Sequence, residues 1–321
     1  MGTSSFPNGF SGGVVLQNVP VTIPHPGKVF WVNNTTVLAD QGAGGSNGND
    51  GSYRRPFSTL DYAVGRCSAG RGDVIYVMPG YTQTMSAADA VDIDVAGVKV
   101  IGLGVGNTRP KFTYDNSAGE FVIGAANVSI ENLWFVPSVT GITHAVDVEA
   151  TFTGAKIISC EFSGAETPGT DEFNAAITVG TTANDGVIQG CFFDAGLAGA
   201  VYAISLATPG NWQILDNVII GDYSTACIGT ITGAGVNCHM YRNTVVNGHA
   251  GALNTVAVFT QSAAGSWYVG NNMFATDVAT GILFFTNYTS TINLGNVYTD
   301  DTTMAGTAGA TSATIVAFVD A

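Results

Sequence analysis

The sequence contains few charged residues, and positive charge is the scarcest. Charged side chains make up 11% of the 321 residues, and only 10 are Lys or Arg against 24 Asp or Glu, which gives a net charge of −14. So few basic side chains argue against a nucleic-acid partner, because neutralising phosphates requires Lys and Arg. The 46% of hydrophobic residues argues against intrinsic disorder, which goes with low hydrophobicity.

Long apolar runs are also missing. No window approaches the ~20 uninterrupted apolar residues of a membrane span, and no charged start with an apolar run and a small-residue cleavage site indicates a secretory signal. We therefore expect no membrane partner. The five cysteines are odd in number and, like the four histidines, show no metal-ligand spacing. Neither a disulfide framework, nor a metal, nor another cofactor is expected.

What the sequence has in excess is glycine, with 42 residues, and a short phrase that recurs every 24 to 31 residues. Aligned, the phrases form three columns. The first column reads Val100, Ile130, Ile157, Ile188, Ile214, Met240, Val269 and Asn293. The second reads Leu103, Leu133, Cys160, Cys191, Asn217, Asn243, Asn272 and Asn296. The third reads Val105, Phe135, Phe162, Phe193, Ile219, Val245, Phe274 and Tyr298.

A second run of β-branched or aromatic residues lies in each interval, bounded by Gly, Asn, Thr and Asp. These runs cover residues 145–148, 176–179, 203–206, 227–231, 256–259, 282–285 and 315–318. Such runs are typical of strands, and no interval contains a helical pattern long enough for a crossover helix. Short strands in coils of this length, without helices, predict an all-β parallel β-helix.

In a parallel β-helix each coil stacks on the one before at about 4.8 Å, so like residues lie on like. The Ile and Phe columns then form apolar ladders in the core. The four asparagines of the second column predict an inward amide ladder at a bend. Cys160 and Cys191 lie in the same column, as packing residues or, alternatively, as a thiol pair. Tight turns with positive φ account for the glycine excess.

The segment before the first coil predicts a short helix. Phe57, Leu60, Val64 and Cys67 lie on one face of an amphipathic helix, Ser58 is the expected N-cap, and glycines 65, 70 and 72 end it. A strand over Asp73–Met78 and a Pro79–Gly80 turn follow. This D-G-S…P-F-x-T-L…G-D-x-I-x-V-x-P-G pattern, with the repeats, resembles the pectate-lyase-like right-handed parallel β-helix superfamily. We expect an extended N-terminal arm (1–38), a cap segment (39–72) and the β-helix solenoid (73–321).

The resemblance implies several activities, because the superfamily includes lyases, glycosidases, tailspikes and virion proteins. A lyase of this kind needs a calcium-binding acidic cluster and a base. Residues 112–321 offer only Lys156 and Arg242 as basic side chains, on different coils. An anionic substrate would also be repelled by the acidic body.

The glycosidases of the superfamily carry paired aspartates with G-H-G and R-x-K motifs. Asp300–Asp301, Asp171–Glu172 and His249 are only fragments of that set. We therefore expect no catalytic residue and predict that the chain is not an enzyme. The sequence leaves open whether two carboxylates of neighbouring coils meet at the about 5–9 Å that glycosidases use.

Residues 1–38 differ from the rest of the chain. Lys28 is their only charged residue, and their prolines interrupt any helix. They predict an arm that adds to a partner's sheet or groove. The alternative is an arm folded back along its own β-helix. The expected partner-binding residues are apolar: Phe6, Phe10, Val14, Val15, Leu16, Val19, Val21 and Ile23.

The distribution of charge also distinguishes the N-terminal part of the chain from the rest. Residues 1–111 hold eight basic and seven acidic residues, whereas residues 112–321 hold two basic and seventeen acidic ones. This distribution indicates solvated turns on an acidic body or, alternatively, a near-neutral end that docks and an acidic body that stays in water. The run from the arm through V-F-W-V-N-N (29–34) into the S-N-G-N-D-G-S of the cap (46–52) also looks like hypothetical and structural proteins encoded by tailed bacteriophages.

The sequence thus predicts a non-enzymatic phage virion protein, a capsid decoration or cement protein anchored through its N-terminal part. The expected partner is the major capsid protein or another virion protein. The expected location is the virion surface, after assembly in the host bacterial cytoplasm. We also expect a homo-oligomer, with a trimer favoured. The alternatives are a tail fibre or tailspike-type receptor-binding protein and a polysaccharide lyase or glycosidase.

Overall fold

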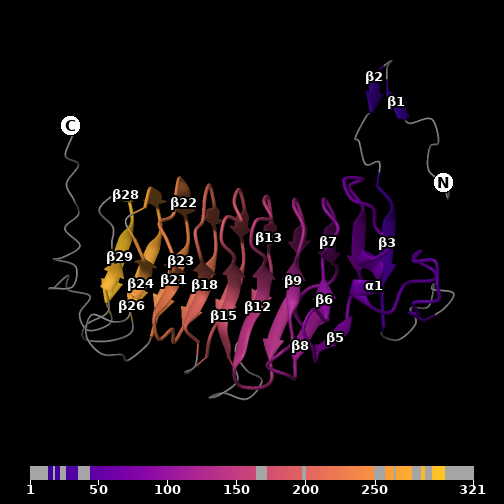
Figure 1. Cartoon of the computed structure of the whole chain (residues 1–321), viewed down its shortest axis with the longest axis horizontal. Helices are drawn as coiled ribbons and strands as arrows, with labels where there is room; N and C mark the ends of the chain where they lie inside the picture. The colour runs from indigo at the N-terminus through magenta and orange to yellow at the C-terminus, as the bar shows by residue number, and fades with distance from the viewer. Residues whose placement is uncertain are drawn as a thin grey trace, which may run out of the picture.

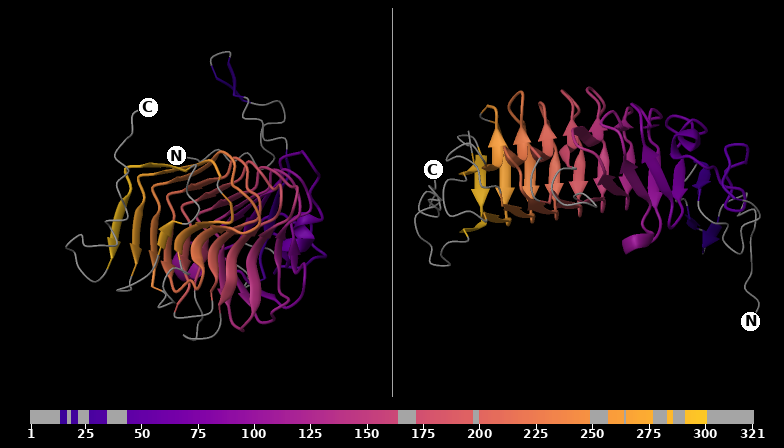
Figure 2. Two further views of the ribbon diagram at one scale, coloured as in Figure 1. Left: turned by 60° about the vertical axis from the view of Figure 1, so that its left-hand side comes forward. Right: turned by 90° about the horizontal axis from the view of Figure 1, so that it is seen from below.

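The computed structural model describes residues 14–16, 19–21, 27–34, 44–163, 172–196, 200–248, 257–263, 265–276, 283–285 and 291–300. Over these residues the chain coils into an elongated stack with three parallel sheets along its length (Figures 1 and 2). The all-β parallel β-helix expected from the repeats is confirmed. None of the described helices is long and apolar enough to cross a membrane.

The first sheet has ten described strands in parallel register. They are β3 (Val29–Val32), β4 (Val74–Val77), β7 (Lys99–Gly102), β10 (Ser129–Glu131), β13 (Lys156–Ile158), β16 (Val187–Gln189), β19 (Gln213–Leu215), β22 (Cys238–Tyr241), β25 (Trp267–Gly270) and β28 (Thr291–Leu294).

The second sheet has nine described strands. They are β5 (Thr82–Met85), β8 (Lys111–Tyr114), β11 (Trp134–Pro137), β14 (Glu161–Phe162), β17 (Phe192–Asp194), β20 (Val218–Gly221), β23 (Thr244–Asn247), β26 (Met273–Thr276) and β29 (Val297–Asp300).

The third sheet has eight described strands. They are β6 (Val91–Asp92), β9 (Phe121–Ile123), β12 (Ile142–Val148), β15 (Phe173–Val179), β18 (Tyr202–Leu206), β21 (Ala226–Thr230), β24 (Ala257–Gln261) and β27 (Leu283–Phe285). The six runs predicted between residues 145 and 285 correspond to the third-sheet strands β12, β15, β18, β21, β24 and β27. The last predicted run, 315–318, lies outside the described residues.

The strand register reproduces the sequence columns, with one correction. Val100, Ile130 and Ile157 pair directly, as do the later members of the first column. In the third column, however, Phe112 and not Val105 pairs with Phe135. Val105 is 82% exposed and precedes the 3₁₀ turn η1 (Gly106–Thr108). This coil has a longer turn than the later ones, which shifts the inward position by seven residues.

From β10 onward a bend of two residues joins each strand of the first sheet to the next strand of the second sheet. The residue before each member of the second column from Leu133 onward has a left-handed φ between 52° and 65°. These residues are Asn132, Ser159, Gly190, Asp216, Arg242, Asn271 and Gly295. A left-handed residue turns the chain sharply, and Gly, Asn and Asp tolerate it best. The bend therefore aims the second-column side chains into the core.

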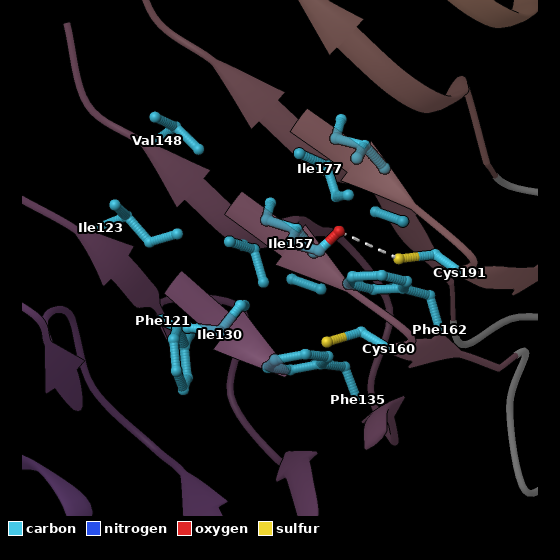
Figure 3. Close-up of a cluster of buried hydrophobic side chains, with 14 of the residues drawn as sticks. Phe121, Ile123, Ile130, Phe135, Val148, Ile157, Cys160, Phe162, Ile177 and Cys191 are labelled. Atoms are coloured by element: carbon cyan, nitrogen blue, oxygen red, sulfur yellow. Dashed lines mark hydrogen bonds between the residues drawn. The ribbon is translucent and has the colours of Figure 1, made fainter. Parts of the chain in front are cut away.

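Aromatic rings fill the core of the coils nearer the N-terminus. The rings of Phe135 and Phe162 stack at 5.0 Å (Figure 3), and those of Phe162 and Phe193 stack at 4.8 Å. Cys160 and Cys191 are buried beside them as free thiols, and the Cys191 Sγ lies 3.5 Å from the carbonyl oxygen of Ile157. Burial raises the pKa of the Cys191 thiol well above its ordinary value, so this group packs as a neutral side chain.

Amides fill the same second column in the later coils. The Nδ2 of Asn217 donates to Oδ1 of Asn243 at 2.9 Å, Asn243 donates to Asn272 at 2.9 Å, and Asn272 donates to Asn296 at 2.9 Å. The backbone N–H of each donor residue reaches the same Oδ1. The inward asparagine ladder is confirmed as a structural element.

The cap contains a helix that is shorter than predicted, α1 (Leu60–Val64), with Thr59 and not Ser58 at its N-cap. The side chain of Asn47 caps it from outside. Its Oδ1 accepts from the Ser58 N–H at 3.1 Å, the Ser58 hydroxyl at 2.9 Å and the Thr59 N–H at 3.3 Å. Because these donors are already satisfied, Ser58 remains in the loop and the helix starts two residues later.

The first strand of the solenoid comes from within residues 1–38. β3 pairs in parallel with β4, and the buried Asp73 fixes their start. Its Oδ1 accepts from the Lys28 N–H at 2.6 Å, and its carboxylate receives two bonds of 2.6 Å from Arg71. Burial alone would raise the pKa of Asp73, but bonds from Arg71, Ser68 and Lys28 lower it below its ordinary value.

Candidate functional site

The residues predicted to bind a partner lie at the N-terminal end, ahead of the stack. Val14, Val15 and Leu16 form β1 (Val14–Leu16), which pairs antiparallel with β2 (Val19–Val21), the strand that contains Val19 and Val21. Of the described strands, these two belong to none of the three solenoid sheets, and Figure 1 shows them beside the end that carries α1. Phe6, Phe10 and Ile23 lie outside the described residues. The partner-binding role of all eight stays a prediction.

The catalytic fragments considered in the sequence do not come together in the described part of the chain. Lys156 is exposed on β13, and Arg242 is held by Asp216, with bonds of 2.6 and 2.8 Å. Their strands are separated by β16 and β19 in the first sheet. Glu172 is buried at a small pocket that includes Phe162, Phe193 and Tyr223, a space for about one water molecule. Asp171, His249 and Asp301 lie outside the described residues.

An acidic cluster that the sequence analysis missed lies on the outer face of the third sheet. Asp92 on β6 and Glu149, directly after β12, lie on either side of Gly124, which follows β9. A Cβ added at Gly124 would lie 2.7 Å from the Asp92 Oδ1 and 3.2 Å from the Glu149 Oε2. The absence of a side chain at Gly124 therefore lets two carboxylates of different coils converge on one point.

Asp92 is the perturbed member of this cluster. Its Oδ1 is buried without a hydrogen-bond partner in the described part of the chain. Burial, together with the nearby carboxylates of Asp94, Asp89, Glu149 and Asp61, raises the pKa of Asp92 to about 6. A carboxylic acid with such a pKa exchanges its proton near neutral pH, beside a second carboxylate.

The signal for this cluster was present in the sequence but could not be interpreted there. Asp92 and Asp94, then Asp147 and Glu149, occupy alternate positions, which places each pair on one face of a strand. Their proximity depends on the register of β6, β9 and β12, in which Asp92 pairs with Val122 and Val122 with Asp147. The weak first strand of this sheet, two residues long, gave no repeat to align.

No known protein-family profile matches the chain, and no curated protein matches its sequence. Solved structures, however, match the fold of the chain. The periplasmic alginate epimerase AlgG matches with 12% identity and a TM-score of 0.38 over 71% of this chain and 62% of the epimerase, so the match spans less than two thirds of that protein. A rhamnogalacturonan lyase matches with 14% identity and a TM-score of 0.40 over 78% of this chain and 69% of the lyase. The GH136 lacto-N-biosidase from Eubacterium ramulus matches with 10% identity and a TM-score of 0.38 over 85% of this chain and 68% of the biosidase.

These comparisons correct one prediction. We expected that the chain is not an enzyme, and this is contradicted because all three solved structures are named as enzymes. The fold therefore gives no ground for excluding activity, while the likeness itself extends to the fold and assigns no reaction to this chain. With its coils stacked into three parallel sheets, the chain is a parallel β-helix.

Proposed function

We propose that this chain is a structural protein of a tailed-bacteriophage virion, a capsid decoration or cement protein anchored through its N-terminal part. Its partner would be the major capsid protein or another virion protein, and its place the virion surface. The observation that carries the proposal is the contrast between the two ends. One end bears the β1–β2 pair outside the solenoid sheets and eight of the ten basic residues, and the acidic body follows it.

The fold suits this role because a solenoid is a rod whose coils contact only their neighbours. An attachment at one end leaves the other coils free to extend from the surface. The seventeen acidic residues of 112–321 would keep neighbouring rods apart and in water. A homo-oligomer, with a trimer favoured, remains part of the proposal and is tested by sedimentation of the purified chain.

The test is a deletion of residues 1–26, assayed on particles of the encoding phage assembled without this protein. The structure sets this limit, because the Lys28 N–H and β3 belong to the folded stack. We expect the shortened chain to keep its β circular dichroism and thermal unfolding but to lose particle binding. A shortened chain that still decorates particles would contradict the anchor.

The location on the particle separates decoration from receptor binding. Quantifying the chain on purified heads and on purified tails distinguishes the two. Many copies on heads support a decoration or cement protein, whereas a few copies confined to tails support the tail fibre or tailspike-type alternative.

A second candidate function is favoured by the acidic cluster. The Asp92 Oδ1 and the Glu149 Oε2 lie 2.7 and 3.2 Å from the position that a Cβ would take at Gly124, so the two carboxylates are close enough for the short separation, about 5–5.5 Å, that retaining glycosidases use. Asp92, whose raised pKa near 6 suits a general acid, and Glu149 as nucleophile would then cleave a glycosidic bond.

This candidate is tested on a polysaccharide panel by release of reducing ends. Asp92→Asn and Glu149→Gln should each abolish release, whereas Asp115→Asn, at an exposed turn residue, should leave it unchanged. Release that persists in both variants would exclude the pair as the catalytic residues.

A further inference from the structure

The outer face of the first sheet carries an aromatic group at its N-terminal end. Trp31 on β3 lies in register with Tyr76 on β4, and their ring centroids are 4.9 Å apart. Tyr53, from the cap loop, meets Trp31 edge-on at 5.1 Å. Val29, two residues before Trp31 on the same face, is 43% exposed. We call Val29, Trp31, Tyr53 and Tyr76 the aromatic surface.

The three rings of the aromatic surface are only partly buried, although they are large enough to fill a core. Trp31 contacts both tyrosines, and each of the three rings leaves area open to solvent. Trp and Tyr, together with Arg, are the residue types most enriched among the energetically dominant contacts of protein interfaces. The composition of the aromatic surface therefore matches that of an interface centre.

Positive charge borders the aromatic surface. Lys28 precedes Val29, Arg54 follows Tyr53, and both are exposed. Neither makes an ion pair within the described part of the chain.

Two acids, one in the cap loop and one on β10 of the same sheet, pair with cations. Asp50 lies 3.7 Å from Arg55, and Glu131 lies 2.8 Å from Lys99. The surface thus has an excess of positive charge in a protein of net charge −14.

We infer that the aromatic surface, with Lys28 and Arg54 at its border, docks on an acidic protein surface that has apolar area to accept the rings. This inference rests on the proposed function, because it names the chemistry of the virion partner. Charge complementarity argues for an acidic occupant, since two unpaired cations would be repelled by a basic one. The surface lies on the folded stack, so it would orient the rod where the arm alone would only tether it.

The test compares two charge reversals, one in the cap loop beside the aromatic surface and one on the first sheet. Arg54→Glu changes the border of the aromatic surface, and Lys156→Glu changes an equally exposed cation on β13, several coils away. Binding to particles lacking the protein is measured at low and high salt. We expect Arg54→Glu to weaken binding at least about tenfold at low salt, with the difference shrinking at high salt, and Lys156→Glu to bind like the wild type.

A second variant, Tyr53→Ala, tests the rings, with circular dichroism as the control for folding. We expect weaker binding at both salt concentrations, because this change removes apolar contact and no charge. Polyglutamate should compete with particle binding, and dextran should not.

The outcomes separate the two proposals. If the wild type binds particles while Arg54→Glu and Tyr53→Ala bind equally well, the inference is overturned and the proposed function stands. A wild type that binds no particles overturns both. Competition by dextran and not by polyglutamate would identify a glycan-binding surface and overturn the assignment of an acidic protein partner.

Discussion

The coils nearer the N-terminus and those nearer the C-terminus solve the same packing problem with different chemistry. Up to Phe193 the stack is held by rings at 4.8 to 5.6 Å from one another. From Asn217 onward it is held by amides that bond from coil to coil at 2.9 Å. Ring stacking is tolerant of small shifts between coils, whereas a buried amide must find its partner in a fixed place. The amide region therefore specifies its register more strictly.

The largest effect is expected from breaking the ring region. Phe162 is buried between Phe135 and Phe193, so Phe162→Ala should destabilise the fold by about 3–5 kcal/mol through lost burial and the remaining cavity. Urea unfolding followed by circular dichroism measures this. Phe192→Ala, at the 38% exposed neighbour on β17, is the control and should cost much less. Equal losses in the two variants would show that the ring stack does not contribute specifically.

A somewhat smaller effect is expected from breaking the amide region. Asn243→Ala removes the acceptor of Asn217 and three donated bonds, to the carbonyls of Ile214 and Tyr241 and to Asn272. Buried groups left without partners cost about 1–3 kcal/mol each, so we expect a total of about 2–4 kcal/mol by urea unfolding. Hydrogen exchange should increase in β20 and β23 and not in β8. Asn174→Ala, at an exposed position on β15, should change neither measurement.

The acidic cluster gives a pH-dependent difference between the two regions. The pKa of Asp92 is about 6 in the folded chain and about 3.9 when unfolded. Its contribution to stability is therefore fully present below pH 4 and lost as the pH rises through 6. Asp92→Asn should raise the melting temperature at pH 8 and leave it nearly unchanged at pH 3.5. A variant that is less stable than the wild type at pH 8 would contradict the raised pKa.

The smallest effect is expected at the surface. The Arg242–Asp216 pair has a short 2.6 Å contact, but its side chains are 57% and 36% exposed. Such pairs contribute about 0–1 kcal/mol, so Arg242→Gln should shift the urea midpoint only slightly, and less still in 0.5 M salt. A loss of stability as large as that of Asn243→Ala would show that surface charges, and not only the buried amides, hold the C-terminal coils in register.

Much of the fold follows from the sequence because stacking places equivalent residues on one another. The first column and the asparagine ladder are predicted from the sequence because each repeat contributes one equivalent residue to each ladder. Val105 was misplaced because a longer turn breaks the spacing, and Ser58 because its capping partner, Asn47, lies eleven residues away. Local patterns contain no information on such contacts.

The candidate sites were harder to predict for the same reason. Asp92 and Glu149 come close only through the register of three coils. Gly124 contributes by having no side chain, which leaves room for both carboxylates. Trp31, Tyr53 and Tyr76 come from two strands and a cap loop. Their residue types are ordinary in a β-rich sequence, and only the fold shows that they share an outer face.

The amide ladder has a direction, and this affects how the chain is built. The side-chain amide of each of Asn217, Asn243 and Asn272 donates to the asparagine of the coil that follows, and it also donates to a backbone carbonyl of the coil before. During synthesis the amide of the newest coil can therefore bond the coil before it at once, whereas its second acceptor, the Oδ1 of the next asparagine, has not yet been made. A chain truncated within this region would consequently leave the side-chain and backbone N–H of its last asparagine without that acceptor.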